Sequence, residues 1–168
     1  MLDEGGAPMP QVRVSVAVPR TAADVFDFLA DGCNLARWHS GVAEIRVDRA
    51  GTYRYRFPGR RRETLLQRWL DQEGWRISFL GERLWTPLGS QVPRHDFRVA
   101  PHGDGCHVDI GVSVRLWGGM VALWPVVEMG WRRDLPEDAR RLYRLLTAAG
   151  QGGAVADSGA ARVRSRQN

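Results

Sequence analysis

The sequence predicts an α+β fold in which a seven-stranded antiparallel sheet carries a long C-terminal helix, with two short helices after the first strand. Three observations predict it. The first apolar segment alternates in the manner of a half-buried strand, and six further strand-like segments follow, separated by turn residues. The last part of the domain has apolar residues at helical spacing. Short connections imply antiparallel neighbours, and helices on one face of such a sheet make an α+β domain.

The first strand is predicted from residues 12–18, where four valines alternate with small or polar side chains. Pro19 ends it. Thr21 then precedes Asp24 by three residues at the head of an apolar pattern of helical period, which resembles a capping box and predicts a helix to about Ala30. Residues 33–39 (CNLARWH) predict a second short helix.

Turn residues divide the middle of the chain into strands. They include Pro58-Gly59, Glu73-Gly74 and the segment around Pro87-Leu88-Gly89. The strands predicted between such turns span residues 42–48, 51–57, 62–72, 74–82, 91–100 and 105–117.

A long amphipathic helix is predicted from about Met120 to Leu146, with one broad apolar face. Pro125 and Pro136 must begin or kink parts of it, because proline lacks the N–H that the helix needs. The residues outside this domain, 1–10 and 150–168, are poor in large apolar groups, so we expect disordered tails around a single domain of residues 11–149.

Composition excludes several classes of function. No apolar run approaches the roughly 20 residues that span a bilayer, and the start of the chain is acidic where a signal peptide is basic, so we expect a soluble, cytoplasmic protein. All 24 basic residues are arginine and no nucleic-acid motif lies among them, which favours a solvated surface. Cys33 and Cys106 lack metal-ligand spacing, and there is no P-loop, GxGxxG or nucleophile elbow. We expect no cofactor and no metal.

Four segments carry a resemblance to a known superfamily: VPRTAADVFDFLAD followed by NLARWHSGV, then GWRISF, and finally LWPVVEMGWRRDLPEDARRLYRLL. In this order the chain resembles the START-like (SRPBCC) superfamily over residues 11–148, and most closely its polyketide cyclase/dehydrase branch. The resemblance implies a helix-grip fold, in which a curved sheet grips the long helix around a deep pocket for hydrophobic molecules. Such a fold hosts many functions and does not choose one.

Aromatic side chains are the first candidates for a binding site. The chain has seven tryptophans, which suits a flat apolar ligand, although core packing and capping of sheet edges are the commoner roles of any single tryptophan. Tyr53, Tyr55 and Phe57 share one face of a strand, and the two hydroxyls would bind a substrate carbonyl there or reach only the rim. The aromatic residues predicted to bind substrate are Trp38, Tyr53, Phe57, Trp69, Trp124 and Trp131.

Polar side chains among apolar neighbours are the second set of candidates. His39, at the exit of the second short helix, is the first choice for proton transfer, with Tyr55 and Glu128 as the other catalytic candidates, and a solvent-exposed turn histidine is the alternative. Gln67, His95 and Arg132 are predicted to contact substrate. Alternation alone leaves open whether these strand residues point inward, and the Glu128 to Arg132 spacing also fits an ordinary surface ion pair. An arginine that binds substrate, as the cyclase branch implies, has three candidates: Arg62, Arg68 and Arg132.

These features predict a cofactor-independent cyclase of secondary metabolism such as antibiotic biosynthesis. Its partner would be a hydrophobic, polyketide-like small molecule, folded for ring closure by aldol condensation with dehydration or by a pericyclic step. A non-catalytic carrier of a lipid or quinone is the alternative, and an interaction module with a collapsed cavity is a third. The sequence predicts no nucleic-acid partner and no membrane span, and it leaves the oligomeric state open.

Overall fold

The architecture was examined in a computed structural model, which describes residues 10–160 and the side chains of residues 10–148. All strands pair antiparallel in one sheet with the order β1-β8-β7-β5-β4-β3-β2, and β6 pairs with β7 at its margin. The elements are β1 (Gln11–Val18), α1 (Ala22–Ala30), the 3-10 helix η1 (Gly32–Arg37), β2 (Glu44–Arg49), β3 (Thr52–Arg56), β4 (Thr64–Asp71), β5 (Arg76–Gly81), β6 (Leu84–Thr86), β7 (Gly89–His102), β8 (Gly105–Gly118), the 3-10 helix η2 (Gly119–Leu123) and α2 (Trp124–Ala160).

The predicted α+β order is confirmed, with one strand more than expected. β6, which was not predicted, pairs Leu84 with Gln91 and Thr86 with Gly89, across the turn that the sequence analysis treated as a simple connection. Three residues are too few to display a period of two, so alternation could not identify this strand.

The two short helices form where the sequence places them. The Thr21 hydroxyl accepts a hydrogen bond from the Asp24 amide at 3.2 Å, so the N-cap of α1 is the predicted one. Asp31 caps η1 in the same way, accepting from the Cys33 amide at 3.0 Å. η1 therefore follows α1 after a single residue and directs the chain onto the sheet.

Helix α2 begins at Trp124 with Pro125 in its first turn, where a missing N–H costs nothing. It continues through Pro136 and on past Gly150, the expected start of the C-terminal tail, to Ala160. Extending an existing helix fixes only one residue per added hydrogen bond, which makes such an extension cheap. The remaining parts of the two predicted tails, residues 1–9 and 161–168, lie outside the described residues. Within the described chain, no helix has the length and apolar character needed to cross a membrane.

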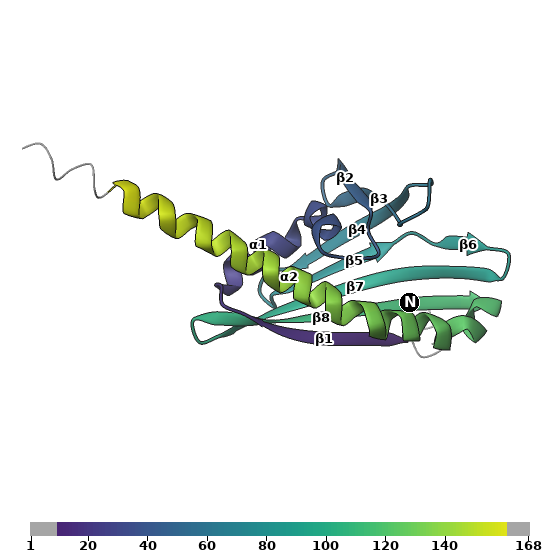
Figure 1. Cartoon of the computed structure of the whole chain (residues 1–168). Coiled ribbons are helices and arrows are strands. Elements are labelled where there is room, and N and C mark those ends of the chain that lie inside the picture. The colour runs from purple at the N-terminus through teal and green to yellow at the C-terminus, as the bar shows by residue number, and fades with distance from the viewer. Residues whose placement is uncertain (1–9, 161–168) are drawn as a thin grey trace, which may run out of the picture.

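The sheet has an inner face toward the helices and an outer face away from them. In Figure 1, α2 runs diagonally across the sheet and extends beyond its edge, and it packs on β1. Leu135, Ala139, Leu142 and Leu146 of α2 are buried against the inner face. Because successive strand residues alternate between faces, the side chains next to the buried ones point outward. The inner face therefore holds the core, and the polar candidates divide between the two faces.

Candidate functional site

Two histidines meet on the inner face of the sheet, one buried and the other with a side chain that is 9% exposed. His39 follows η1, His95 lies on β7, and their ring centroids are 4.7 Å apart with the rings nearly perpendicular. Trp38, next to His39, packs edge to face against Phe97 at 5.7 Å. Phe97 is two residues beyond His95 on the same strand. Trp38 and His39, which follow η1, therefore both pack against one short stretch of β7. The structure thus brings together three of the predicted site residues.

Four polar atoms on the inner face are buried without a hydrogen-bond partner among the described residues, three of them at this site and one on β3. They are Trp38 Nε1, His39 Nε2, Tyr55 Oη and His95 Nδ1. Buried polar atoms are nearly always paired, since leaving one unpaired costs roughly 1–3 kcal/mol. A hydrogen bond from a bound polar group would therefore be most favourable at these atoms.

Burial controls the charge of both imidazoles. Desolvation lowers the pKa of His39 from 6.5 to about 4. The pKa of His95 falls to about 3, chiefly through desolvation and secondarily through the neighbouring His39. The negative charge of Asp96 raises this pKa, but by less than the other two effects lower it. Both rings are consequently neutral at pH 7, when each can donate one hydrogen bond and accept another.

Asp138 of α2 holds the loop that carries His39. Its carboxylate accepts the Ser40 amide at 3.1 Å and the Ser40 hydroxyl at 2.9 Å. The residue is 1% exposed, and desolvation raises the pKa of its carboxyl group against the lowering effect of Ser40. Asp138 therefore connects the long helix directly to the histidine loop.

The hydrogen bonds of His39 fix its tautomer. Its Nδ1 accepts the Gly41 amide at 2.9 Å, so this nitrogen carries no proton and the neutral ring holds its proton on Nε2. The 3.6 Å separation between Nδ1 and the Asp138 carboxylate is for this reason not an ion pair. His39 thus presents a buried Nε2–H donor toward the core.

Tyr53 and Tyr55 share the inner face of β3 but differ in their partners. Arg68 donates to the Tyr53 hydroxyl at 3.1 Å and also to the carbonyl of Ala30, which joins β4 to the end of α1. The Tyr55 hydroxyl has no partner among the described residues, and burial raises its pKa to about 12. Phe57 packs on Tyr55 at 5.0 Å. Within residues 10–148, Tyr55 forms no hydrogen bond and no ring contact with either histidine.

The remaining candidates lie away from the histidine pair. Gln67 and Trp69 point outward from β4, and Trp69 is 59% exposed, because Leu66 of the same strand takes the inner face. Trp124 packs against Trp131 at 5.7 Å beside Met120, near the start of α2.

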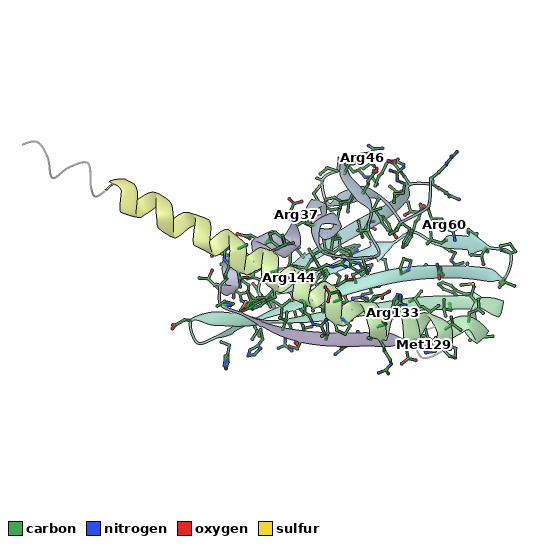
Figure 2. The ribbon with its side chains drawn as sticks, viewed as in Figure 1. Arg37, Arg46, Arg60, Met129, Arg133 and Arg144 are labelled. Atoms are coloured by element: carbon green, nitrogen blue, oxygen red, sulfur yellow. The ribbon has the colours of Figure 1, made fainter. Side chains whose placement is uncertain are left out.

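Glu128 and Arg132 form an i,i+4 ion pair at 2.6 Å in which the Arg132 side chain is 68% exposed. Figure 2 shows the neighbouring Met129 and Arg133 on the same part of α2. Such exposed pairs contribute little to stability and leave both charges accessible to solvent.

Two hollows are open to solvent, and neither is lined by the histidines. One of about 460 Å³ lies between β1 and α2, against Val14, Val16, Ala139 and Tyr143. The other, of about 680 Å³, lies on the outer face of the sheet. Within residues 10–148, no three His, Cys, Asp or Glu side chains gather as metal ligands. The histidine pair is thus enclosed beneath the η1 loop and α2.

Asp138 was not among the predicted site residues, although the sequence holds a signal for it. It lies three residues after Leu135 and four before Leu142, and so falls on the buried stripe of α2 beside Ala139, although Glu137 and Arg140 near it are charged. His95 has a similar signal: it alternates with Arg94 and Asp96 but is in phase with Phe97 and is therefore on the apolar side of β7.

Comparison with known proteins gives a consistent result. A family model described as "Polyketide cyclase / dehydrase and lipid transport" matches residues 9–147. A search of curated proteins finds no match.

Solved structures of the same fold include the ZhuI aromatase/cyclase from Streptomyces sp. R1128, with 15% identity, a TM-score of 0.63, and coverage of 83% of this chain and 94% of that one. Norcoclaurine synthase from Thalictrum flavum, in complex with dopamine and hydroxybenzaldehyde, has 15% identity, a TM-score of 0.61 and coverage of 88% and 96%. A START superfamily protein from Mycobacterium smegmatis has 16% identity, a TM-score of 0.60 and coverage of 83% and 98%.

At these identities the structural neighbours establish the fold, and the family model identifies the family. The chain belongs to the polyketide cyclase/dehydrase and lipid transport family and has the START-like helix-grip fold that its sequence resembles.

Proposed function

We propose that this protein is a cofactor-independent cyclase that closes a ring in a hydrophobic, polyketide-like intermediate. The observation that carries the proposal is the pair of neutral, buried imidazoles of His39 and His95, each with a ring nitrogen that lacks a partner among the described residues. The family assignment supports the substrate class, and the aromatic side chains of Trp38 and Phe97 beside the pair suit a flat ligand.

The proposed chemistry is an aldol-type closure without net oxidation or reduction. The His39 Nε2–H donates to a ketone oxygen, while His95 Nδ1 removes a proton from the carbon next to that ketone. The resulting enolate carbon forms a carbon–carbon bond with a second carbonyl, whose oxygen takes the proton back from His95. Loss of water then leaves a double bond in the new ring.

The lowered pKa values determine which of the two proton transfers by His95 is the easier one. A group with a pKa of about 3 is a weak base, but its protonated form is a strong acid and returns the proton readily to the new alkoxide. Most of the acceleration would therefore come from holding the two reacting carbons in contact. A pericyclic closure depends on the same positioning and requires no proton transfer.

Tyr55 is the third member of the proposed site. With its pKa raised to about 12, the phenol stays protonated at neutral pH and is available to donate to a carbonyl. Because all these atoms are buried, the proposal requires an opening movement that admits substrate, and separation of the η1 loop from α2 is the one that we propose. The Asp138 to Ser40 hydrogen bonds close that path and would have to open.

The test uses native mass spectrometry and tryptophan fluorescence quenching with a panel of linear and aromatic polyketide-like compounds. We expect a bound compound to be converted to a product of equal mass or one water lighter. His39→Gln and His95→Gln should abolish turnover while binding persists. His102→Gln is the matched control, because His102 packs against His107 in a second T-shaped pair at 4.6 Å on the β7–β8 hairpin. Turnover that survives both inner substitutions would refute the assignment.

A carrier of a hydrophobic small molecule is the second candidate function. The hollow of about 460 Å³ between β1 and α2 favours it, since Val14, Val16, Pro136 and Ala139 give it an apolar lining. The family description also includes lipid transport. A carrier would bind its ligand without converting it, and Ala139→Phe would block binding where the two histidine substitutions would not.

A further inference from the structure

The outer face of the sheet has a hollow of about 680 Å³ that is separate from the histidine site. It spans β1, β8, β7 and β5, and its charged lining consists of four arginines and two aspartates, an excess of two positive charges. The arginines are Arg13, Arg76, Arg94 and Arg98. They alternate in sequence with the inner-face residues, so the sheet itself separates this hollow from His95.

Three of these arginines form no ion pair within the described part of the protein, although Asp109 of β8 lies directly opposite Arg98 in the sheet. Arg94 forms an ion pair with Asp96 at 2.9 Å and also donates to the Ser78 hydroxyl, so its charge is compensated within the protein. Arg13, Arg76 and Arg98, in contrast, form no ion pair with any residue that the structure describes. Arg76 and Arg98 are nevertheless direct cross-strand partners. Like charges placed opposite one another destabilise a sheet, and Asp109 on the other side of Arg98 offsets part of that cost.

Arginines elsewhere on the same sheet behave differently. At the opposite edge, Arg46 pairs with Glu63 at 2.8 Å and Arg54 with Asp48 at 2.8 Å, while Arg56 pairs with Glu44. Figure 2 shows Arg46 at that β2 edge. Arg49 on β2 and Arg115 on β8 also form no ion pair with a described residue, but the hollow is where three such guanidinium groups lie together.

Gly111 forms part of the floor of the hollow and is buried beneath the Gln11 side chain. It lies between Arg13 on β1 and Asp96 on β7. A Cβ built on Gly111 would lie 3.2 Å from Gln11 Nε2, 3.6 Å from the Asp96 carbonyl oxygen and 3.8 Å from Arg13 Cγ, so only the flexible end of Gln11 would have to move. A bound group reaches this floor when the Gln11 side chain moves aside.

We propose that this hollow binds a phosphate-bearing small molecule, with the guanidinium groups of Arg13, Arg76 and Arg98 bonded to phosphate oxygens. Guanidinium forks match the oxygens of phosphate in bidentate geometry, and a bound dianion removes the repulsion between Arg76 and Arg98. The volume lies within the range of roughly 300–1,000 Å³ usual for small-molecule sites, so an organic group attached to the phosphate also fits.

Isothermal titration calorimetry of the full chain with pyrophosphate tests the proposal, with ADP as the organic phosphate and sodium chloride at matched ionic strength as the salt control. We expect saturable binding of one pyrophosphate. Arg76→Gln and Arg98→Gln should each weaken it by at least about tenfold, the effect expected when a hydrogen bond between charged groups is lost. Tighter binding of ADP than of pyrophosphate would identify an organic phosphate as the ligand, and equal binding would identify the anion alone.

Arg46→Gln is the matched control, because it removes the same charge from the same face outside the hollow. Gly111→Leu fills the floor without changing charge and should also weaken binding, which separates a shaped site from a diffuse positive surface. Absence of saturable binding, or an equal loss in Arg46→Gln and Arg98→Gln, would overturn the proposal. Because the arginines are exposed, these variants should keep the wild-type circular dichroism spectrum.

Discussion

Gly32 at the start of η1 lies directly against the ring of Tyr53. A Cβ built on Gly32 would be 2.7 Å from Tyr53 Cζ and 2.9 Å from two further ring atoms. The ring cannot withdraw easily, because its hydroxyl is bonded to Arg68 and its edge contacts Phe79. This close approach determines how deeply η1 sits on the sheet.

Gly32→Ala should therefore lower the free energy of unfolding by about 1–3 kcal/mol, the usual cost of overpacking a core. Urea denaturation followed by circular dichroism measures the change. Gly130→Ala is the control: it lies on α2 with nothing within 4 Å of the added Cβ, so it should stabilise the protein by about 0.5–1 kcal/mol through helix propensity. Equal stability of the two variants would show that Gly32 does not pack as described.

Tyr55→Phe should leave the free energy of unfolding unchanged or raise it by up to about 1 kcal/mol, because it removes a buried hydroxyl that has no partner among the described residues. Tyr53→Phe should lower it by about 1 kcal/mol, since the Tyr53 hydroxyl accepts from Arg68. If the proposed function holds, Tyr55→Phe combines this retained stability with reduced turnover. A clear loss of stability in Tyr55→Phe would contradict the unpaired hydroxyl.

Asp138→Ala should lower the free energy of unfolding by about 1.5–3 kcal/mol, because the amide and hydroxyl of the partly exposed Ser40 lose a buried, charged acceptor. Glu137→Ala, one residue earlier, removes only exposed ion pairs with Arg140, Arg141 and Arg144 and should cost less than about 1 kcal/mol. Thermal and urea unfolding of both variants compare them, and similar losses would show that the buried bonds contribute nothing special.

Stability should fall as the solution becomes acidic through pH 6.5. The pKa values of His39 and His95 are lowered in the folded state to about 4 and about 3, so below pH 6.5 the unfolded chain binds more protons. Their contribution is complete above pH 6.5 and is lost progressively toward pH 4 and below, with a slope of up to about 2.7 kcal/mol per pH unit for two protons. The raised pKa of Asp138 acts in the opposite direction and reduces this slope near pH 4.

Urea unfolding from pH 7.5 to pH 4.5 measures this dependence. His95→Gln should flatten the curve by removing one of the two protons, whereas His102→Gln, on the exposed end of β7, should leave its shape unchanged. A stability profile that is flat between pH 6.5 and pH 4.5 in the wild type would rule out two neutral buried histidines.

The sequence was sufficient to predict most of the fold because its signals are local. Four alternating valines mark β1, the Thr21 hydroxyl caps α1, and the apolar stripe of α2 includes Leu135 and Leu142. Local patterns failed where a feature was too short, as in β6, or where the outward and inward phases of a strand both held large side chains. Trp69 is an example, since it follows Arg68 and precedes Leu70 without a clear apolar phase.

The site was predicted only in part because it depends on contacts between distant segments. His39 and His95 were separate candidates, and nothing local indicated that they touch. Asp138 was missed because it lies among charged residues, and its burial follows from the helix face rather than from its neighbours in sequence. Tyr55 and Tyr53 could be placed on one face, but the partner of each hydroxyl depends on Arg68, which comes from another strand.

The hydrogen bonds between Ser40 and Asp138 join positions 98 residues apart. Contacts across so long a loop form late in folding, because closing the loop loses chain entropy before the contacts contribute any favourable free energy. On the ribosome, the loop bearing His39 emerges early, but its acceptor is made only with the last helix. The histidine loop is therefore secured at the end of synthesis, when α2 reaches the sheet.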